Sequence, residues 1–480
     1  MTPSYVSAFA GALLLLGRLP GSAAEFKTSS RDEIVASSNK LAKDLFTVYE
    51  GDQPGKIPGI LPGPPTPSSG GYYWYHGASF FQTYVDYQHL TGDDSFQDSI
   101  VKALAFQLGP DANYMPPNWT ASMGNDDQCF WGTAALQAAE YQLPSADGKP
   151  SWIEVAKNVW ANQASPDRYD ETCGGGLRWQ IIMSNAGYNY KNTMSNACFL
   201  NMGARLARYT GNTSYAEHAV KAWDWLESVG FINTTTWEVY DGANVDDNCT
   251  SPAKYQWSQN AAILTESAAF MYNFTNGSDV WHDRAKKLAE ASIKTFFPKG
   301  IAYEAACEGT KGSCPTDAMF MKGYVHRWLS VATQVAPFLS GNVLTVLRSS
   351  AQAAAKQCQD NSKGMTTCGF YWSDAELTDP QTVDNRTGGI TGVGEGTSVL
   401  GAISGLLIGD AKAPVTNWIE GSGGASMPEP TTSTGSGGTP SGTGGSPSPT
   451  ESDSLAGHFG TDVRMLLFPA VLGACLLALY

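Results

Sequence analysis

The chain has 480 residues and a formal net charge of −15, and only 16% of its residues are charged. An acidic protein is repelled by polyanions, so nucleic acid is excluded as an expected partner. The 14 Trp and 21 Tyr residues suit a neutral carbohydrate, whose C–H faces stack on aromatic rings while its hydroxyls bond amides and carboxylates.

The N-terminal segment predicts a signal peptide. An apolar run at residues 6–16 precedes three small residues at 22–24, which is the pattern of a cleavage site. The run is also too short to span a membrane. We therefore expect residues 1–24 to be removed and the chain to be secreted, with residues 25–420 forming one folded domain.

Six helix-like segments recur along this domain at intervals of about 53 to 69 residues. Each segment opens with a polar or aromatic cluster and continues into a nearly all-apolar run rich in small residues, as expected of a buried helix. The segments begin near Tyr73, Asp126, Lys191, Gln256, Lys322 and Thr391.

Amphipathic helices follow several of these segments. Residues 95–108, 214–229 and 280–297 place apolar residues on one helical face opposite a charged face, which is typical of a helix that covers a core on one side. Six inner and about six outer helices predict an all-α fold, an (α/α)6 toroid. Because the inner helices of such a ring run parallel, their opening clusters are expected to meet at one cleft.

A low-complexity segment follows the predicted domain. Residues 421–452 are mostly Gly, Ser, Thr and Pro, which predicts a flexible, O-glycosylated stalk. Small residues, a polar spacer and an apolar run from Met465 then give the layout of a glycosylphosphatidylinositol (GPI) signal. We expect residues 453–480 to be removed and Ser452 or Ser454 to carry the anchor. The alternative is a short tail-anchor helix.

Cysteines and sequons indicate an oxidising, glycosylated compartment. Cys475 lies in the removable tail, and the remaining eight cysteines suggest four disulfides. Cys307 with Cys314, and Cys358 with Cys368, are close enough in sequence to close small loops. The spacing leaves open the pairing of Cys129, Cys173, Cys198 and Cys249.

Asn-x-Ser/Thr sequons lie at Asn118, Asn212, Asn233, Asn248, Asn273, Asn276 and Asn385. The six histidines show no metal-ligand spacing, so we expect no metal and no cofactor.

Two adjacent carboxylates open the second inner segment, at Asp126 and Asp127. One interpretation is helix capping, where Asp is favoured. The other is catalysis, because neighbouring carboxyl groups can lie about 5 Å apart, the separation of a retaining glycosidase, whereas inverting enzymes need roughly 6.5–9.5 Å. One carboxylate would then attack the anomeric carbon while the other protonates the leaving oxygen. The position at an inner helix favours catalysis.

Seven runs occur in order along roughly residues 27 to 410: YYWYHGASFFQTYVDYQHLTGDDSF, NDDQCFWGTAALQAAE, CGGGLRWQI, YKNTMSNACFLNMGARLARYTGN, VYDG, QWSQNAA and FMKGYVHRWL. Together they resemble glycoside hydrolase family 76, and within it the fungal lipid-anchored members described as mannan endo-1,6-α-mannosidases. The resemblance implies an (α/α)6 fold, α-1,6-mannan as substrate and a retaining mechanism. It also implies that Asp126 is the nucleophile, Asp127 the acid/base and Asp241 a substrate-site carboxylate.

Further residues at the predicted cleft are candidates for substrate binding. They are Trp74, His76, Trp131, Trp179, Asn192, Asp241, Gln256, Asn260, Lys322 and Arg327. The tryptophans can be sugar platforms or core residues. Lys322 and Arg327 can bond sugar hydroxyls or form pairs within the ring.

Three functions agree with these features. The first is a hydrolase of α-1,6-mannan. The second is a transglycosylase, in which another glycan intercepts the glycosyl-enzyme. The third is a non-catalytic mannan-binding wall protein. The resemblance favours the second, because fungal members of the family are thought to process the mannose core of GPI-anchored glycoproteins and join them to wall glucan. We expect the protein at the extracellular face of the plasma membrane, held by its lipid anchor, and in the cell wall.

Overall fold

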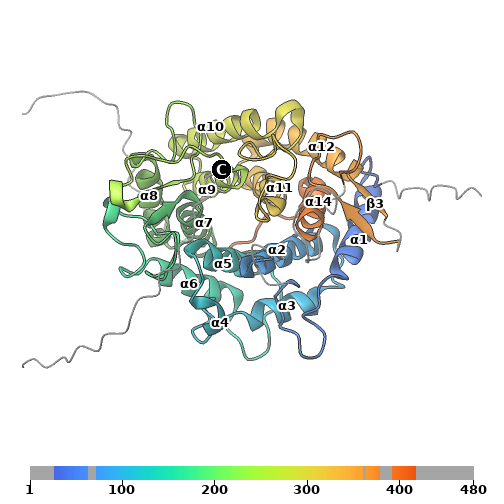
Figure 1. Ribbon diagram of the computed structural model, residues 1–480, viewed down its shortest axis with the longest axis horizontal. Helices are drawn as coiled ribbons and strands as arrows, with labels where there is room; N and C mark the ends of the chain where they lie inside the picture. Colours follow the sequence, from blue (N-terminus) through green and yellow to red (C-terminus); the bar gives the residue numbers. More distant parts are fainter. Residues whose placement is uncertain (1–25, 63–71, 361–363, 379–391, 418–480) are drawn as a thin grey trace, which may run out of the picture. The chain divides into compact units, whose positions relative to one another are not determined.

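Figure 1 shows α-helices in two concentric rings, in a computed structural model of the chain. The structure describes residues 26–62, 72–360, 364–378 and 392–417, all within one compact unit that spans Met1–Pro430. In this part of the chain the inner ring consists of α2 (Trp74–Thr91), α5 (Asn125–Glu140), α7 (Thr193–Thr210), α9 (Ser258–Phe274), α11 (Ala318–Val335) and α14 (Val393–Ser404). Each inner helix contacts the next, and α14 closes the ring against α2.

The outer ring covers the gaps between inner helices. It is formed by α1 (Arg31–Phe46), α3 (Gln97–Phe106), α6 (Trp152–Gln163), α8 (Thr213–Ser228), α10 (Asp279–Phe296) and α12 (Ser340–Lys356). Helix α1 packs on both α14 and α2, so the first described helix lies where the ring closes. The (α/α)6 fold predicted from the repeats is confirmed.

Burial explains why the two sets of helices differ in composition. In α5 every side chain except that of Asp127 is buried, because both neighbouring inner helices and α6 pack against it. In α10 the buried residues follow one face, as in an amphipathic helix. Gly92 and Gly211 end α2 and α7 in the left-handed conformation, with φ values of 79° and 73°, which glycine adopts without a steric penalty.

One inner helix begins earlier than predicted. Helix α11 starts at Ala318, whereas the sequence pattern placed its start near Lys322. The residues Met319 to Met321 already continue the buried apolar surface of the helix. Lys322 therefore lies one turn inside α11, and the residue that precedes the helix is Asp317.

Two short antiparallel strand pairs and several short helical turns lie between the longer helices. Strand β1 (Tyr190–Asn192) pairs antiparallel with β2 (Gly242–Asn244), and β3 (Cys358–Asp360) pairs with β4 (Thr366–Cys368). The other short elements are α4 (Pro117–Thr120), η1 (Thr172–Gly174), η2 (Val245–Asp247), η3 (Pro298–Gly300), η4 (Pro337–Leu339) and η5 (Gly405–Asp410).

Four disulfides are present in the described residues. The predicted pairs Cys307–Cys314 and Cys358–Cys368 are both formed, and the second joins β3 to β4. The two remaining pairs, Cys129–Cys198 and Cys173–Cys249, span long stretches of sequence. Cys129–Cys198 ties α5 to α7, so it links two neighbouring helices of the inner ring.

Charged side chains are buried between the inner helices. Arg327 of α11 bonds Asp86 and Gln82 of α2, and Arg205 of α7 bonds Glu140 of α5. The prediction that Arg327 binds substrate does not agree with this position, because its guanidinium bonds other inner-helix side chains. Paired buried charges of this kind fix which helices are neighbours.

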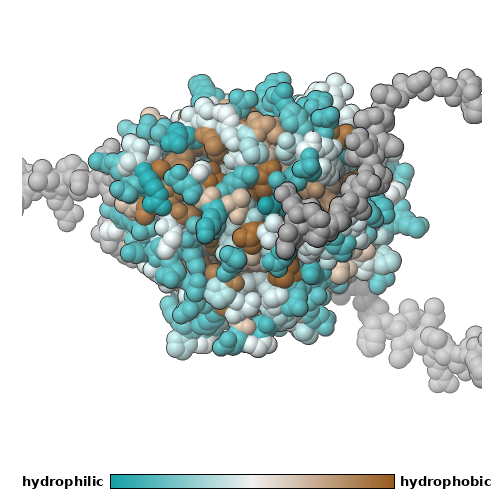
Figure 2. All heavy atoms as spheres, turned by 180° about the vertical axis from the view of Figure 1, so that it is seen from behind, coloured by the Kyte–Doolittle hydropathy of each residue, from teal (hydrophilic) through white to brown (hydrophobic). Residues whose placement is uncertain are grey.

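The surface seen from the opposite side is largely hydrophilic, with scattered hydrophobic residues among the polar ones (Figure 2). Among the described helices, none combines the length and apolar character needed to cross a membrane. The predicted signal peptide, stalk and anchor serines lie outside the described residues, as does Asn385.

Candidate active site

A cleft of about 560 Å³ opens where the inner helices begin. The first turns of α2, α5, α7, α9 and α11 contribute to it, as expected for parallel inner helices. The described residues that line it include the four carboxylates Asp126, Asp127, Asp241 and Asp317, and they include no lysine or arginine. The cleft is therefore acidic and suits a neutral or cationic ligand.

The two adjacent aspartates lie together on the cleft wall. Oδ1 of Asp126 accepts a hydrogen bond from the Asp127 backbone N–H at 3.0 Å, and Oδ2 accepts one from Nδ2 of Asn192 at 2.9 Å. Oδ2 of Asp127 accepts the backbone N–H of Gly124 at 2.7 Å. Both carboxylates thus bond the start of α5 and also face the cleft, so the capping and catalytic interpretations are compatible.

Burial sets the ionisation of the pair. It raises the pKa of Asp126 well above its ordinary value, and the neighbouring Asp127 charge raises it further. Burial raises the pKa of Asp127 to about 6, with the Gly124 hydrogen bond opposing the rise and the Asp317 charge adding to it. Coupled carboxyl groups lose their protons in two separate steps, so the pair holds a single proton over an intermediate pH range.

Gly124 lets both carboxylates approach the helix start. A Cβ at this position would lie 2.4 Å from Oδ1 of Asp126, 3.1 Å from the Trp179 carbonyl oxygen and 3.3 Å from Oδ2 of Asp127. The two carboxylates therefore surround one point of the cleft wall, and only glycine leaves room for them.

Asp241 lies in the same cleft, as the sequence predicts. Its Oδ2 accepts the hydroxyl of Tyr190 at 2.8 Å, and the Trp257 side chain also donates to it. Burial raises the pKa of Asp241, and these two hydrogen bonds oppose the rise. Asn260, another predicted residue, lies nearby on the cleft wall. Tyr190 was not among the candidates, although it lies two residues before Asn192.

Asp317 is a cleft carboxylate that sequence reasoning missed. The misplaced start of α11 concealed it, because the residue before an inner helix is where the cleft residues gather. The hydroxyl of Tyr75 donates to Oδ1 of Asp317, and Nε2 of His76 lies 3.2 Å from the same oxygen. His76 was predicted to bind substrate, but it is fully buried behind Asp317 and does not line the cleft.

The tryptophans divide between the cleft and the core. Trp179 lines the cleft and is 39% exposed. Trp74 and Trp131 are buried and pack against each other with ring centroids 5.4 Å apart, and Trp74 donates to Gln107. The prediction that Trp74 and Trp131 bind sugar therefore does not agree with their position. Both lie on the side of their helices that packs against the core.

Two further predicted residues lie outside the cleft. Lys322 is buried within α11, where it pairs with Glu308 at 2.8 Å and donates to the Phe370 carbonyl. That pairing fixes the segment before α11, so Lys322 supports the cleft wall rather than contacting substrate. Gln256 is partly exposed but does not line the cleft, unlike the next residue, Trp257.

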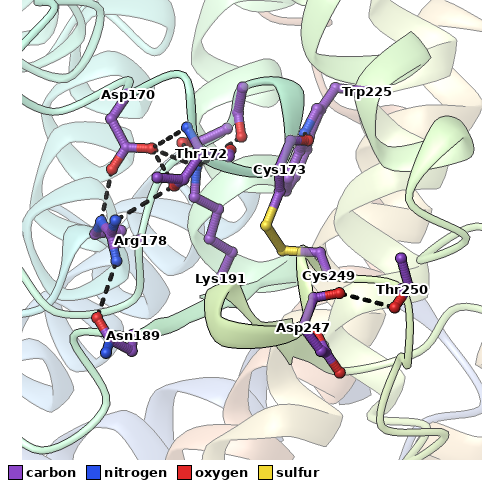
Figure 3. The surroundings of a disulfide bond; sticks show 12 residues. Asp170, Thr172, Cys173, Arg178, Asn189, Lys191, Trp225, Asp247, Cys249 and Thr250 are labelled. Atoms are coloured by element: carbon purple, nitrogen blue, oxygen red, sulfur yellow. Dashed lines mark hydrogen bonds and ion pairs between the residues drawn. A yellow bond between two sulfur atoms is a disulfide. The ribbon is translucent and has the colours of Figure 1, made fainter.

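The loop before Trp179 is held by a buried charge cluster (Figure 3). Lys191 bonds Asp170 at 2.7 Å and also donates to three backbone carbonyls of the loop. Arg178 bonds Asp170 at 2.6 Å. Burial would raise the pKa of Asp170, but the hydrogen bonds from Lys191, Thr172 and Arg178 outweigh it and lower the pKa to about 2. The Cys173–Cys249 disulfide ties the same loop to the segment after β2. These contacts hold the loop that leads to Trp179, which lines the same cleft as Asp126.

Within the described ranges, no group of three His, Cys, Asp or Glu side chains is placed to hold a metal ion. The described cleft lining offers carboxylates, amides and aromatic rings. This arrangement can position a carbohydrate and exchange a proton with it.

The model of glycosyl hydrolase family 76 matches residues 33–418. The chain belongs to this family. It is a glycosidase by this membership, and its α-helical ring agrees with the family's (α/α)6 fold.

Relatives in family 76 include proteins from several fungi. Mannan endo-1,6-alpha-mannosidase DCW1 of Saccharomyces cerevisiae is 38% identical over 397 residues, which cover 82% of this chain and 83% of that protein. The protein of the same name from Candida glabrata is 42% identical over 335 residues, or 69% of this chain and 72% of that protein.

Solved structures of family 76 proteins share the fold. Dfg5 from Chaetomium thermophilum, in complex with glucosamine, is 51% identical, with a TM-score of 0.78 over 82% of this chain and 94% of that chain. An inactive variant of the α-1,6-mannanase of a Salegentibacter species, in complex with α-1,6-mannotriose, is 16% identical, with a TM-score of 0.60 over 78% of this chain and 99% of that chain.

Proposed function

We propose that this family 76 member is a retaining glycosidase that cleaves α-1,6-linked mannan, with Asp126 as nucleophile and Asp127 as acid/base. The observation that carries the proposal is the placement of both carboxylates around Gly124 on the wall of one acidic cleft. Carboxyl groups this close leave no room for a water molecule to attack between them, as an inverting mechanism requires.

The hydrogen bonds around the pair support this division of roles. Both oxygens of Asp126 accept N–H donors, which favours a carboxylate ready to attack the anomeric carbon. Among the described residues only one oxygen of Asp127 accepts a hydrogen bond, so the other can carry a proton into the cleft. Burial raises the pKa of both carboxyl groups, so the division of roles rests on these hydrogen bonds.

Two displacements follow from these roles. In the first, Asp126 bonds to the anomeric carbon, the glycosidic C–O bond breaks, and the proton of Asp127 passes to the leaving oxygen. In the second, an acceptor hydroxyl attacks the same carbon while Asp127 takes its proton. Asp126 then leaves as a carboxylate, and the enzyme returns to its starting state.

The surroundings of the pair support a neutral glycan as substrate. Trp179 and Tyr73 are 39% and 47% exposed and line the cleft, so their faces are open for sugar stacking. Gln180, Gln259 and Asn260 supply amides that bond hydroxyls. The fungal relatives are named for α-1,6-mannan, which supports the linkage. The inactive Salegentibacter variant carries asparagine at two adjacent aspartate positions, and that protein binds α-1,6-mannotriose.

We further propose that the acceptor is a second glycan and that the protein processes the mannose core of GPI-anchored glycoproteins, joining them to wall glucan. A retaining mechanism is required for such transfer, because only it forms a glycosyl-enzyme that an acceptor can intercept. A GPI anchor on this protein would place it beside the anchors of its neighbours. Plain hydrolysis of α-1,6-mannan is the second candidate, since water can occupy the acceptor position.

A secreted, wall-associated location agrees with the surface chemistry. Four disulfides are typical of an oxidising compartment. Five described sequon asparagines are exposed, and a sixth, Asn233, is partly exposed and bonded within its own turn. The exposed asparagines are Asn118, Asn212, Asn248, Asn273 and Asn276.

Product analysis tests the proposal. The purified protein is incubated with α-1,6-mannooligosaccharides, with and without an acceptor glycan, and the anomeric form of the first product is followed by NMR. We expect products that retain the α configuration, longer products when an acceptor is present, and neither with Asp126→Asn. The matched control is Asp94→Asn, which changes an exposed aspartate of another adjacent pair.

Each other outcome has a defined meaning. Shorter products alone would support the plain hydrolase. Products of inverted configuration would contradict the assigned roles of Asp126 and Asp127. Binding without turnover by the unmodified protein would favour a mannan-binding wall protein.

A further inference from the structure

A third carboxylate lines the same cleft as the adjacent pair. Asp317 comes directly before α11 and lines the cleft together with Asp126 and Asp127. Its side chain is 35% exposed, so it remains in contact with the cleft. Tyr75 and His76 of α2 both bond its Oδ1, which fixes the carboxylate in one orientation.

The hydrogen bonds of His76 define its protonation. The backbone N–H of Tyr73 donates to Nδ1 at 2.8 Å, so Nδ1 carries no proton. The ring proton is therefore on Nε2, which points to Asp317 3.2 Å away. The imidazole is fully buried and stacked on Phe320, and as a neutral donor it leaves the negative charge of Asp317 uncancelled.

These donors also keep Asp317 ionised. Burial alone would raise the pKa of Asp317, but the hydrogen bonds from His76 and Tyr75 hold it below its ordinary value. Asp317 is therefore a carboxylate across the whole pH range in which the adjacent pair exchanges its proton.

The titratable groups that face Asp127 come from three elements. Asp126 lies beside it on α5, Asp317 precedes α11, and Tyr73 and Tyr75 come from the start of α2, with His76 behind them. Burial, followed by the charges of Asp317 and Asp127, raises the pKa of both Tyr73 and Tyr75. These two carboxylates and the two tyrosines line one cleft, and no lysine or arginine is among its described lining residues.

We propose that Asp317 is a positioning residue whose fixed negative charge keeps the proton on Asp127 until the leaving oxygen takes it. The inference rests on the proposed function, because it assumes that Asp127 is the acid/base. An uncompensated negative charge nearby disfavours loss of a proton from a carboxylic acid. Tyr75 and His76 act through Asp317 by holding it in place.

The pH dependence of kcat/KM tests this role. On the alkaline side, activity falls as the acid/base loses its proton. Removing the Asp317 charge in Asp317→Asn should move that alkaline limb to lower pH by roughly one unit, the effect of a unit charge at cleft distances. Asp317→Glu keeps the charge and should hold the limb near its original position. Asp94→Asn is the matched control, because it neutralises an exposed aspartate outside the cleft and should leave the limb unmoved.

A loss of activity by Asp317→Asn at every pH, with an unmoved limb, would overturn the proposal, because a merely structural role gives that result. Asp317→Ser provides a second neutral variant if the asparagine variant does not fold. Its limb should move in the same direction.

A separate experiment distinguishes this proposal from the function on which it rests. Asp127→Ala is assayed on an aryl α-mannoside whose leaving group needs no proton, with added azide. Restored turnover and a mannosyl azide product establish Asp127 as the acid/base. If azide restores turnover while Asp317→Asn leaves the limb unmoved, only the role of Asp317 fails. If azide has no effect, the assignment of Asp127 fails.

Discussion

Asn192 donates a hydrogen bond from Nδ2 to Oδ2 of Asp126 at 2.9 Å, while its Oδ1 accepts the backbone N–H of Ser195. The capping residue of α7 thereby holds the candidate nucleophile at the start of α5. The helix cap fixes which way the Asn192 amide points, so only its N–H₂ group can face Asp126.

Replacing Asn192 should therefore impair catalysis more than folding. Asn192→Ala removes a hydrogen bond to a charged acceptor, worth about 1.5–3 kcal/mol, so kcat/KM should fall roughly 10- to 100-fold. Asn192→Ser can still cap α7 but cannot reach Asp126, and it should lose a similar amount of activity with less loss of Tm. Initial rates on α-1,6-mannooligosaccharides and thermal unfolding measure the two effects. Asn158→Ala, an amide outside the cleft, is the control; wild-type rates for Asn192→Ala would contradict the assigned contact.

Adding one methyl group at Gly124 should impair catalysis. The new Cβ would lie 2.4 Å from Oδ1 of Asp126 and 3.1 Å from a backbone oxygen, so the carboxylate must move. We expect Gly124→Ala to lower kcat at least about tenfold, in the range of small misplacements of catalytic groups. Gly341→Ala is the comparison, because its Cβ meets nothing within 4 Å and it lies in the first turn of α12. Equal activity of the two variants would show that the Asp126 position is not constrained by Gly124.

Trp179 and Trp131 should respond differently to truncation, although the sequence left both open as sugar platforms or core residues. Trp179→Ala removes a partly exposed ring that lines the cleft. The loss of a stacking contact of about 1 kcal/mol or more should raise KM by roughly tenfold. The Tm should change little. Trp131→Ala empties a fully buried site and should destabilise the fold by about 3–5 kcal/mol. Steady-state kinetics and denaturant unfolding of both variants provide the comparison. A raised KM for Trp131→Ala without loss of stability would reverse the assignment.

The buried Glu266 should make the fold less stable at neutral pH than at mildly acidic pH. Burial raises its pKa to about 7, with Arg205 opposing the rise. The folded state then holds a proton that the unfolded chain has already released, so the free energy of unfolding falls as pH rises from about 4.5 to about 7. Glu266→Gln keeps the shape and removes the titration. Its Tm should fall less between pH 5 and pH 8 than that of the wild type, whereas the exposed Glu217→Gln should follow the wild type.

Removing the Cys173–Cys249 disulfide should loosen the cleft rim. Its cysteines are 76 residues apart, so the double Cys→Ala variant should lose about 2–5 kcal/mol of stability and bind mannooligosaccharides more weakly through the loop before Trp179. Cys307 and Cys314 are only 7 residues apart, so their disulfide closes a shorter loop. The double Cys→Ala variant of this pair should therefore lose less stability. Thermal unfolding under non-reducing conditions ranks the two, and the opposite order would contradict the loop-closure account.

The ring architecture could be predicted from the sequence because its signals are local and repeated. Burial on all sides gives the inner helices their small, apolar composition, and burial on one side gives the outer helices their charged face. The positions of Asp126, Asp127 and Asp241 followed from their places in the chain and from the family resemblance. The small-loop cysteine pairs followed from spacing alone.

The parts that could not be predicted depend on which way a side chain points. The sequence does not distinguish Trp131 from Trp179 as a sugar-binding residue. A helix turns Trp131 toward the core, whereas a loop turns Trp179 toward the cleft. Lys322 and Arg327 face buried carboxylates on neighbouring helices, which no local pattern shows. Asp317 was missed because the helix boundary was misplaced by one turn, and boundaries are the least certain part of a periodic pattern.

The closure of the ring between α14 and α2 has a consequence for synthesis of the chain. A chain leaving the ribosome presents α2 and α5, with Asp126 and Asp127, long before it presents α11 and α14. Asp317 and the closing contact arrive only with these late helices. A partly translated chain therefore carries Asp126 and Asp127 without Asp317, and the acidic cleft is assembled only after α11 and α14 have been made.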